Sequence, residues 1–392
     1  MKVLNVVGSL DQRSGGPLRV VLNLSAMSAP LGLHTEILGF GPIRIPDNPL
    51  ASELIQSLPL TGPISYGYSS DLRQWCRENL RRFDVVILHG LWMYFNWAVS
   101  RECIKERIPY IVMPHGMLDL WSVHGQGALK RIKKKVYWRW RERKVIEDCH
   151  AVFFTTRREL QNAILTLSLP PCPKLIVNPY GATPCASILP IEPSAKVDQG
   201  KGVKVALFLG RIHPKKRPDL LITAWRDAEV GPEWKLAIAG NGGRSYLSTL
   251  MKLVDRLKLG DAVQFVGTVS GTDKQYLFQR ASWFLLPSEQ ENFGIAAIEA
   301  VQAGCALAIS DQVYLSDDLP EGSEILPVQI GAWSEFMRER MPDEEWRAAQ
   351  VRRVSGALLP KFDREKVAKG WKDAIEASIM RKAAAIADTA TV

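Results

Sequence analysis

Residues 282–310, SWFLLPSEQENFGIAAIEAVQAGCALAIS, contain two apolar segments joined by a short helical pattern. The first segment ends at Pro287-Ser288, and the second begins just after Gly304. Between them, the spacing of the apolar residues predicts a helix that begins near Phe293 and continues through Val301. A strand, a helix and a second strand in this order predict a parallel βαβ unit, in which ligands bind at the ends of the strands.

Two glutamates of this unit suggest a ligand. Glu299 lies among apolar residues of the predicted helix, and Glu291 stands just ahead of the helix start. A buried carboxylate is costly without a partner, and the N–H groups of residues 293–295 are unpaired at a helix start. Glu299 lies about 9 Å along the axis from the predicted start. A molecule with hydroxyls at both ends and an anion between them, such as a nucleotide-sugar, fits this pattern.

The same alternation of apolar segments and helical patterns runs along nearly the whole chain. Because the apolar segments are continuous, we expect strands buried on both faces, in parallel sheets covered by helices. The expected strands are residues 3–7, 35–40, 84–90, 109–116, 151–156, 174–181, 203–210, 235–243, 262–267, 282–288, 305–310 and 324–328. A helix over 17–31 is expected between the first two. The predicted fold class is α/β, with two Rossmann-like domains facing a central cleft.

A linker separates the two halves. Residues 184–202, PCASILPIEPSAKVDQGKG, contain three prolines and two glycines and show little periodicity. We expect an N-terminal domain at 1–186, a linker at 187–199 and a C-terminal domain at 200–368. The length of 392 residues also favours two domains.

Composition excludes several classes of protein. No apolar run reaches the ~18 residues that would span a bilayer. The six cysteines are scattered without a CxxC pair, which indicates reduced thiols in a cytoplasmic protein. The chain has no Asp-x-Asp motif, and its six histidines lack the spacing of metal ligands. We therefore expect neither a metal nor a cofactor.

The net charge of +9 comes entirely from the first half of the chain, where residues 1–190 carry 23 Lys/Arg against 14 Asp/Glu. Residues 130–144, KRIKKKVYWRWRERK, hold nine basic residues and one acid. In a helix, Leu129, Ile132, Val136 and Trp140 would form one apolar stripe.

Three interpretations of this segment remain open: a solvated helix face, a nucleic-acid site, or a surface that contacts anionic lipid headgroups. We favour lipid, because Tyr137, Trp138 and Trp140 suit a membrane interface and no nucleic-acid motif is present. The cations expected at the membrane are Lys133, Lys134 and Lys135.

Two loops suit a phosphate group. Gly15-Gly16, followed by Pro17, opens the first predicted helix and lets backbone N–H groups approach an anion. Residues 210–218, GRIHPKKRP, place four cations where a strand turns into a helix. A plain turn and a solvated basic loop are the alternatives to ligand binding.

Taken together, these motifs resemble glycosyltransferase family 4, whose members are retaining enzymes of the GT-B fold, and the resemblance covers nearly the whole chain. The family's Glu-x7-Glu motif corresponds to Glu291 and Glu299, and its Gly-Arg-x5-Lys turn to Gly210-Arg211 and Lys216. Residues 114–119, PHGMLD, and 88–92, LHGLW, resemble forms found in bacterial exopolysaccharide-biosynthesis enzymes.

The resemblance implies a role for each matching residue. His115, Glu291, Arg211 and Lys216 are the implied catalytic residues: His115 contacts the donor sugar, Glu291 binds its hydroxyls, and the two cations neutralise the leaving diphosphate. Glu299 binds the ribose hydroxyls. The other implied donor-binding residues are Gly15, Gly16, Gly210, Gly240, Phe293, Gly294 and Ile295. His89 and Trp92 are expected on the acceptor or membrane side, and residues 371–392 form a helix that crosses back onto the N-terminal domain.

The implied activity is metal-independent transfer of a hexose, with glucose as the first choice, from a UDP-sugar to a glycan or lipid-linked acceptor. No nucleic-acid partner is expected, and the protein is expected in the cytoplasm, peripheral on the inner face of the cell membrane. A nucleotide-sugar epimerase of the same fold and a non-catalytic basic membrane or nucleic-acid binder remain alternatives.

Overall fold

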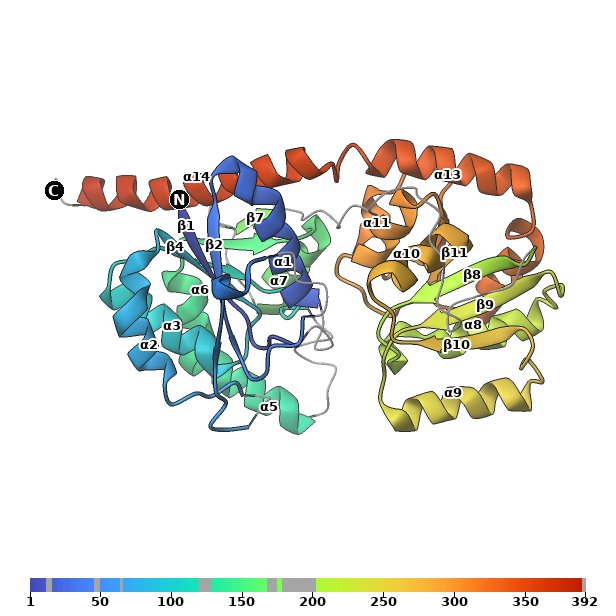
Figure 1. The fold of residues 1–392 in the computed structure, drawn as a ribbon, viewed down its shortest axis with the longest axis horizontal. Coiled ribbons are helices and arrows are strands. Elements are labelled where there is room, and N and C mark those ends of the chain that lie inside the picture. The colour runs from blue at the N-terminus through green and yellow to red at the C-terminus, as the bar shows by residue number, and fades with distance from the viewer. Residues whose placement is uncertain are drawn as a thin grey trace. The chain divides into compact units, whose positions relative to one another are not determined.

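A computed structural model describes residues 1–11, 16–45, 50–63, 66–119, 128–167, 175–177 and 202–389. Gly15 and the predicted linker at 187–199 lie outside the described residues, as do the side chains of 128–130 and 381–389. The chain forms two compact units (Figure 1). Unit 1 comprises Met1–Gly181 and Arg364–Val392, and unit 2 comprises Ala182–Asp363.

Unit 1 is built on a seven-stranded parallel sheet with the order β3-β2-β1-β4-β5-β6-β7. Its strands are β1 (Lys2–Val6), β2 (His34–Phe40), β3 (Ile55–Leu58), β4 (Val85–His89), β5 (Tyr110–Met113), β6 (Ala151–Phe154) and β7 (Leu175–Val177). The described residues of β1, β4, β5 and β6 are almost all buried, which explains their continuous apolar sequences.

Helices cover this sheet (Figure 1). They are α1 (Gly16–Ser28), α2 (Leu72–Asn79), α3 (Tyr94–Lys105), α5 (Ala128–Tyr137), α6 (Arg143–Asp148), α7 (Arg157–Leu167) and α14 (Arg364–Thr389). Short 3₁₀ turns are η2 (Ala29–Leu31), η3 (Ser52–Leu54) and η4 (Leu80–Arg82), and η5 (Trp138–Glu142) is a π-helix.

The last helix, α14, packs on unit 1 although it follows unit 2 in the sequence. The Trp371 ring contacts the Phe153 ring edge-on, with the two centroids 5.4 Å apart. Lys372 Nζ donates to the carbonyl oxygen of Leu31 at 3.0 Å. The helix begins at Arg364, seven residues before the predicted start at 371.

Unit 2 contains a six-stranded parallel sheet with the order β10-β9-β8-β11-β12-β13. Its strands are β8 (Lys204–Leu209), β9 (Trp234–Ala239), β10 (Val263–Gly267), β11 (Ala281–Leu286), β12 (Ala306–Ser310) and β13 (Glu324–Leu326). Its helices are α8 (Pro218–Asp227), α9 (Arg244–Arg256), α10 (Gly271–Arg280), α11 (Ile295–Gln302), α12 (Ile330–Glu335) and α13 (Glu344–Leu358). Short elements are η6 (Pro214–Lys216), η7 (Tyr314–Asp318) and the π-helix η8 (Phe336–Arg340).

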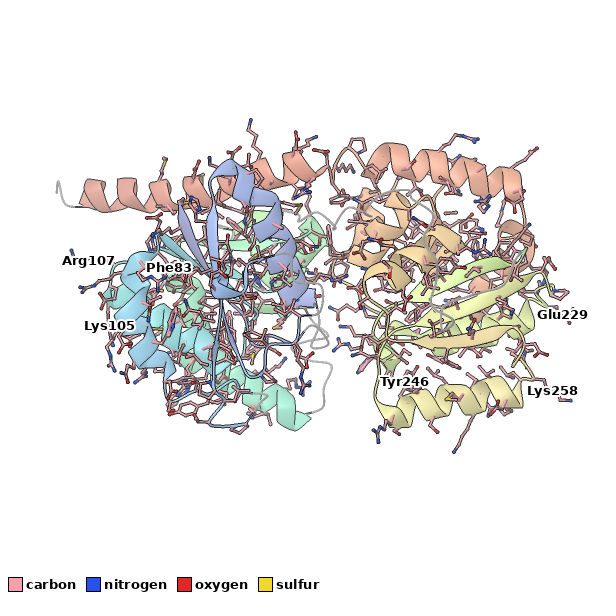
Figure 2. All side chains as sticks on the ribbon, viewed as in Figure 1. Phe83, Lys105, Arg107, Glu229, Tyr246 and Lys258 are labelled. Atoms are coloured by element: carbon pink, nitrogen blue, oxygen red, sulfur yellow. The ribbon has the colours of Figure 1, made fainter. Side chains whose placement is uncertain are left out.

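The amino and carboxyl ends of the strands in this sheet are marked by different residues. Glu229 and Lys258 follow the ends of α8 and α9 and have the left-handed φ angles 52° and 56°. Figure 2 shows both at the end of unit 2 opposite Tyr246, which lies in the first turn of α9. Tyr246 therefore lies at the carboxyl ends of the strands, where the helices begin. Ligands bind at this end of an open parallel sheet.

Each of the twelve predicted strands has a counterpart, and the prediction of an α/β protein with two Rossmann-like domains is confirmed. β3 was not predicted; it is an edge strand in which only Ile55 is fully buried. The helix predicted to follow Glu291 is α11, which begins at Ile295. Among the described residues, no helix is both long and apolar enough to cross a membrane.

Candidate functional site

The ends of β8 and β9 approach each other so closely that one glycine is required. The N–H of Gly210 donates to the carbonyl oxygen of Ala239 at 3.0 Å. Gly240 has φ +143°, and a Cβ atom there would lie 1.7 Å from the carbonyl oxygen of Gly210. A Cβ on Gly210 would only touch the Phe208 ring at 3.8 Å. Only glycine therefore fits at position 240. Its contact with Gly210 lies beneath the turn that follows β8.

The four cations of this turn have different surroundings. Arg217, at φ 53°, is held by Glu289 at 2.9 Å and by Asp219 at 3.2 Å, so its charge serves the turn itself. Arg211 is exposed, and Lys215 is partly buried. Lys216 has a side chain only 12% exposed, and its Nζ forms an ion pair with Glu291. The turn therefore presents Arg211 and Lys216 beside a carboxylate.

Glu291 lies in the loop between β11 and α11, where its backbone is fixed. Its N–H donates to the carbonyl oxygen of Gln312 at 3.2 Å, and its own carbonyl accepts from the N–H of Tyr314 at 3.0 Å. Burial alone would raise the pKa of the Glu291 carboxyl, but Lys216, and less strongly Lys215 and Arg211, lower it below its usual value. Glu291 is therefore ionised and hydrogen-bonded at neutral pH.

Gly294 sets the start of α11. It precedes the helix with φ 73°, a left-handed conformation that favours glycine, and the first bond of the helix runs from Ala297 N–H to the Gly294 carbonyl at 2.8 Å. The Phe293 side chain is buried and packs edge-on against Phe362, with centroids 5.4 Å apart. The Phe293 side chain thus serves packing, and the Ile295 side chain is partly buried.

Glu299 meets a partner within the chain. Lys274, on α10, places its Nζ 2.6 Å from both carboxylate oxygens of Glu299. Both side chains are largely buried, with exposed fractions of 12% and 7%. The prediction that only the ligand contacts Glu299 is therefore wrong, because a buried carboxylate requires a nearby cation.

In unit 1, three polar side chains meet at the carboxyl ends of adjacent strands. Asn5 lies on β1, His89 ends β4, and His115 follows β5. His89 Nε2 lies 2.8 Å from Asn5 Oδ1, and His89 Nδ1 lies 2.9 Å from His115 Nε2. Burial lowers the pKa of His89 well below its usual value and that of His115 to about 4. Both rings are therefore neutral near pH 7.

The backbone around His115 is constrained. His115 has φ 52°, an unfavourable angle for a residue with a side chain, and Gly116 follows at φ 75°. Glu159, buried on α7, accepts from the Gly116 N–H at 2.6 Å and from the Thr155 N–H at 2.8 Å. This carboxylate joins the loop after β5 to the loop after β6 and fixes the direction of the His115 ring.

Trp92 connects the loop after β4 to the basic segment. It has φ 70°, and its N–H donates to Glu142 Oε1 at 2.8 Å, while its indole N–H donates to the Met117 carbonyl at 3.0 Å. Lys134 Nζ lies 5.0 Å from the Trp92 ring centroid. Burial raises the pKa of Glu142 to about 8, although the Trp92 hydrogen bond lowers it.

The basic segment is helical, but a π-helix interrupts its α-helical hydrogen bonding. It runs through α5, the π-helix η5 and α6. Ile132, Val136 and Trp140 are 59%, 54% and 76% exposed, whereas Leu129 has no described side chain. Tyr137 and Trp138 do not lie on this face: Tyr137 packs edge-on against Tyr66, and Trp138 packs against the Trp92 ring and the core. The prediction that both aromatic rings are available to a membrane is wrong.

The structure brings the predicted residues together in two groups. Arg211, Lys216, Glu291 and Glu299 lie at or near the carboxyl edge of unit 2, and His89, His115 and Trp92 lie at that edge of unit 1. A side chain at Gly16 would enter open space, so packing does not require glycine there. Lys133 and Lys135 are exposed on α5.

Sequence reasoning missed the residues that support these groups, namely Asn5, Glu142, Glu159 and Lys274. Only Glu142, the one acid in a basic run, carried a signal in the sequence. In the described part of the chain, no three His, Cys, Asp or Glu side chains lie close enough together to hold a metal ion.

Two family models match the chain. The glycosyl transferase 4-like domain matches residues 15–181, and the glycosyl transferases group 1 model matches residues 192–319. Among curated proteins, a D-inositol 3-phosphate glycosyltransferase of Mycolicibacterium smegmatis is 28% identical over 191 residues, which are 47% of this chain and 41% of that protein. The match thus spans less than half the length of this relative.

Solved structures share the fold at low sequence identity. HepE of Anabaena, crystallised with UDP and glucose, superposes with a TM-score of 0.77 at 13% identity, covering 96% of this chain and all of that one. WaaG, a glycosyltransferase involved in lipopolysaccharide biosynthesis, gives 0.68 at 16% identity, covering 95% of this chain and 98% of that one. The two family models and these superpositions agree with the motifs around Glu291 and Glu299. The chain belongs to glycosyltransferase family 4 and has the GT-B fold.

Proposed function

We propose that the protein is a retaining, metal-independent glycosyltransferase that moves a hexose from a UDP-sugar to a glycan or lipid-linked acceptor. The observation that carries this proposal is the group at the edge of unit 2, where Arg211 and Lys216 stand beside the ionised Glu291. UDP-glucose is the first donor to test, since HepE, a protein of the same fold, has been crystallised with it.

In this proposal the donor lies along the edge of unit 2. The ribose hydroxyls donate to Glu299, which the ion pair with Lys274 holds in place. The diphosphate is neutralised by Arg211 and Lys216 and by the backbone N–H groups at Gly294 and Ile295. Glu291 then accepts from hydroxyls of the sugar. Gly16 and His115, in unit 1, stay predicted donor-binding residues.

The chemistry is the departure of the diphosphate. As the bond between the anomeric carbon and the β-phosphate oxygen breaks, its electron pair moves to the phosphate, and the fixed cations stabilise that charge. The acceptor hydroxyl attacks from the same face of the sugar, and its proton passes to the departing phosphate oxygen. Arg211 and Lys216 supply the positive charge that a metal ion supplies in other enzymes, so chelators are expected to leave the rate unchanged.

A panel of nucleotide-sugars tests the proposal through the nucleotide released without an acceptor. UDP-glucose is expected to release UDP faster than GDP-mannose releases GDP, with and without EDTA. Interconversion of UDP-glucose and UDP-galactose with no UDP released would favour the epimerase alternative. Failure of every nucleoside diphosphate to raise the melting temperature would favour a non-catalytic binder.

We also propose that the exposed side of α5 and η5 contacts an anionic membrane. Ile132, Val136 and Trp140 form an exposed apolar stripe, spaced four residues apart on one helix face. Lys133, Lys135 and Arg139, also exposed, flank it. A stripe of this kind, flanked by cations, suits the boundary between headgroups and acyl chains of anionic lipids. This contact would keep the enzyme near a lipid-linked acceptor.

Vesicle co-sedimentation tests the membrane contact. Replacing Lys133, Lys135 and Arg139 by Glu is expected to abolish binding to vesicles rich in phosphatidylglycerol. Trp140→Ser is expected to weaken binding even at low salt, where attraction between charges is strongest. Lys252→Glu with Arg256→Glu, on the exposed face of α9, is the control and is expected to bind like the wild type. Equal loss in the control, or no loss in the α5 variants, contradicts the proposal.

A further inference from the structure

The hydrogen bonds among Asn5, His89 and His115 define which nitrogen of each ring carries a proton. An amide oxygen can only accept, so at 2.8 Å from Asn5 Oδ1 the His89 Nε2 must carry hydrogen. A neutral imidazole has one N–H, so His89 Nδ1 has a lone pair. At 2.9 Å from that lone pair, His115 Nε2 must be the donor.

The tautomer also determines what Nδ1, the other nitrogen of the His115 ring, can bind. With its one hydrogen on Nε2, a neutral His115 has a lone pair on Nδ1 and can only accept there. A phosphate oxygen or a carboxylate would be repelled by this nitrogen, whereas a hydroxyl can donate to it. Burial supports the neutral state of both rings, since it disfavours the charged form of each.

We propose that Asn5 and His89 are positioning residues that hold His115 in its Nε2–H tautomer, so that Nδ1 accepts a hydrogen bond from a substrate hydroxyl. The inference rests on the proposed function, in which His115 contacts a sugar. The hydroxyl belongs to either the donor sugar or the acceptor, and the chemistry is the same for both.

The rest of the loop supports a precise alignment of this ring. The left-handed φ of His115 is maintained by Glu159, which accepts from the next N–H along the chain. Strained backbone of this kind persists only where the surroundings hold it. The His89 and His115 rings are stacked, with centroids 5.2 Å apart and planes 24° from parallel. Both the orientation of the ring and its tautomer are therefore set by groups outside the substrate.

The tautomer can be measured in the wild-type protein without any substrate. Long-range ¹H–¹⁵N spectra of histidine-labelled protein distinguish Nδ1–H, Nε2–H and imidazolium forms, and a His115→Gln variant assigns the signal. The expected result near neutral pH is an Nε2–H form for both His89 and His115. An Nδ1–H form or an imidazolium at His115 overturns the proposal.

The hydrogen-bonded series Asn5, His89 and His115 is called the relay. Asn5→Leu tests the role of its first residue. The variant removes the Asn5 oxygen that fixes the His89 proton on Nε2, so His115 is expected to become a mixture of tautomers. If the hydroxyl belongs to the donor sugar, hydrolysis of the complete donor is expected to fall about 10-fold, the effect of losing one hydrogen bond. Asn23→Leu, a buried Asn on α1 that is not in the relay, is the matched control and is expected to keep the tautomer and the rate.

Monodeoxy UDP-glucose analogues separate positioning from general damage. If the relay serves a donor hydroxyl, Asn5→Leu is expected to leave the hydrolysis rate of one deoxy donor nearly unchanged while it slows the others. If it serves the acceptor, hydrolysis is unaffected and only transfer falls. Equal losses with every donor and acceptor contradict the proposal. If the wild type hydrolyses no donor, the proposed function fails, and the tautomer measurement still decides the relay.

Discussion

Lys215 and Lys216 are neighbouring cations in the turn after β8 with different surroundings. Lys216 contacts the Glu291 carboxylate, whereas Lys215 lowers its pKa only through its charge. Lys216→Met is expected to reduce kcat for donor hydrolysis by about 100-fold or more, because a fixed cation at the leaving group is lost. It also removes the main group that lowers the pKa of Glu291, so burial then raises that pKa.

Lys215→Met is the matched control, with the same loss of charge one residue away. It is expected to reduce kcat by less than about 10-fold, since Lys216 and not Lys215 forms the ion pair with Glu291. Hydrolysis rates of the two variants at saturating UDP-glucose check this pair. Equal effects would show that the Lys216 contact has no special role.

The ion pair between Lys274 and Glu299 makes a prediction about stability. Lys274→Met leaves a buried carboxylate without its cation, which is expected to lower the free energy of unfolding by about 3–5 kcal/mol. Adding Glu299→Gln removes that charge, so the double variant is expected to regain much of the loss. Urea unfolding of both variants and the wild type measures this, and a double variant less stable than Lys274→Met would contradict the account.

At the scale of single elements, the π-helix η5 holds a buried acid. Burial raises the folded-state pKa of Glu142 from 4.5 to about 8. As pH rises between these values, the unfolded chain releases this proton and the folded chain keeps it, so Glu142 lowers stability by about 1.4 kcal/mol per pH unit. Above about pH 8 the destabilisation by Glu142 has reached its full size. Below the ordinary pKa of the carboxyl it disappears.

Glu142→Gln removes this proton uptake while keeping an acceptor for the Trp92 N–H. The variant is expected to be more stable than the wild type at pH 7.5, and its advantage is expected to shrink by about 2 kcal/mol at pH 6. Urea unfolding at the two pH values measures the change. A constant difference between the two proteins would show that Glu142 is already ionised in the folded state.

Sequence patterns predicted the elements that are buried on both faces. Continuous apolar segments such as Val85–His89 predict interior strands well, because only a buried strand tolerates such composition. The edge strand Ile55–Leu58 alternates weakly and gave no signal. The π-helix η5 was also missed, because the apolar residues around it follow the spacing of an ordinary α-helix.

The same limit applies to the site. Glu291, Arg211 and Lys216 belong to a motif with fixed spacing along the chain, so sequence alone identified them. Lys274 and Asn5 come from elements that are distant in sequence and meet the site only through the order of the strands and helices. Their partners, Glu299 and His89, were predicted as ligand contacts because nothing in the local sequence reveals such long-range pairs.

At the scale of the whole molecule, the two units are expected to have separate tasks. Arg211, Lys216 and Glu299 all belong to unit 2, so nucleotide binding is expected to depend on that unit. His115→Ala is therefore expected to leave the Kd for UDP within about 3-fold of wild type, while donor hydrolysis falls about 10-fold or more through the lost contact to the sugar. Calorimetry with UDP and the hydrolysis assay check this division, and a parallel loss of UDP affinity would contradict it.

The crystal structure of the protein with bound UDP is the most direct test of the central claim, that unit 2 binds the nucleotide between acidic groups and cations. The account predicts the diphosphate within hydrogen-bonding distance of Arg211 and Lys216, the ribose hydroxyls on Glu299, and the Lys216–Glu291 ion pair lengthened or broken. A nucleotide bound away from these four side chains would contradict the account.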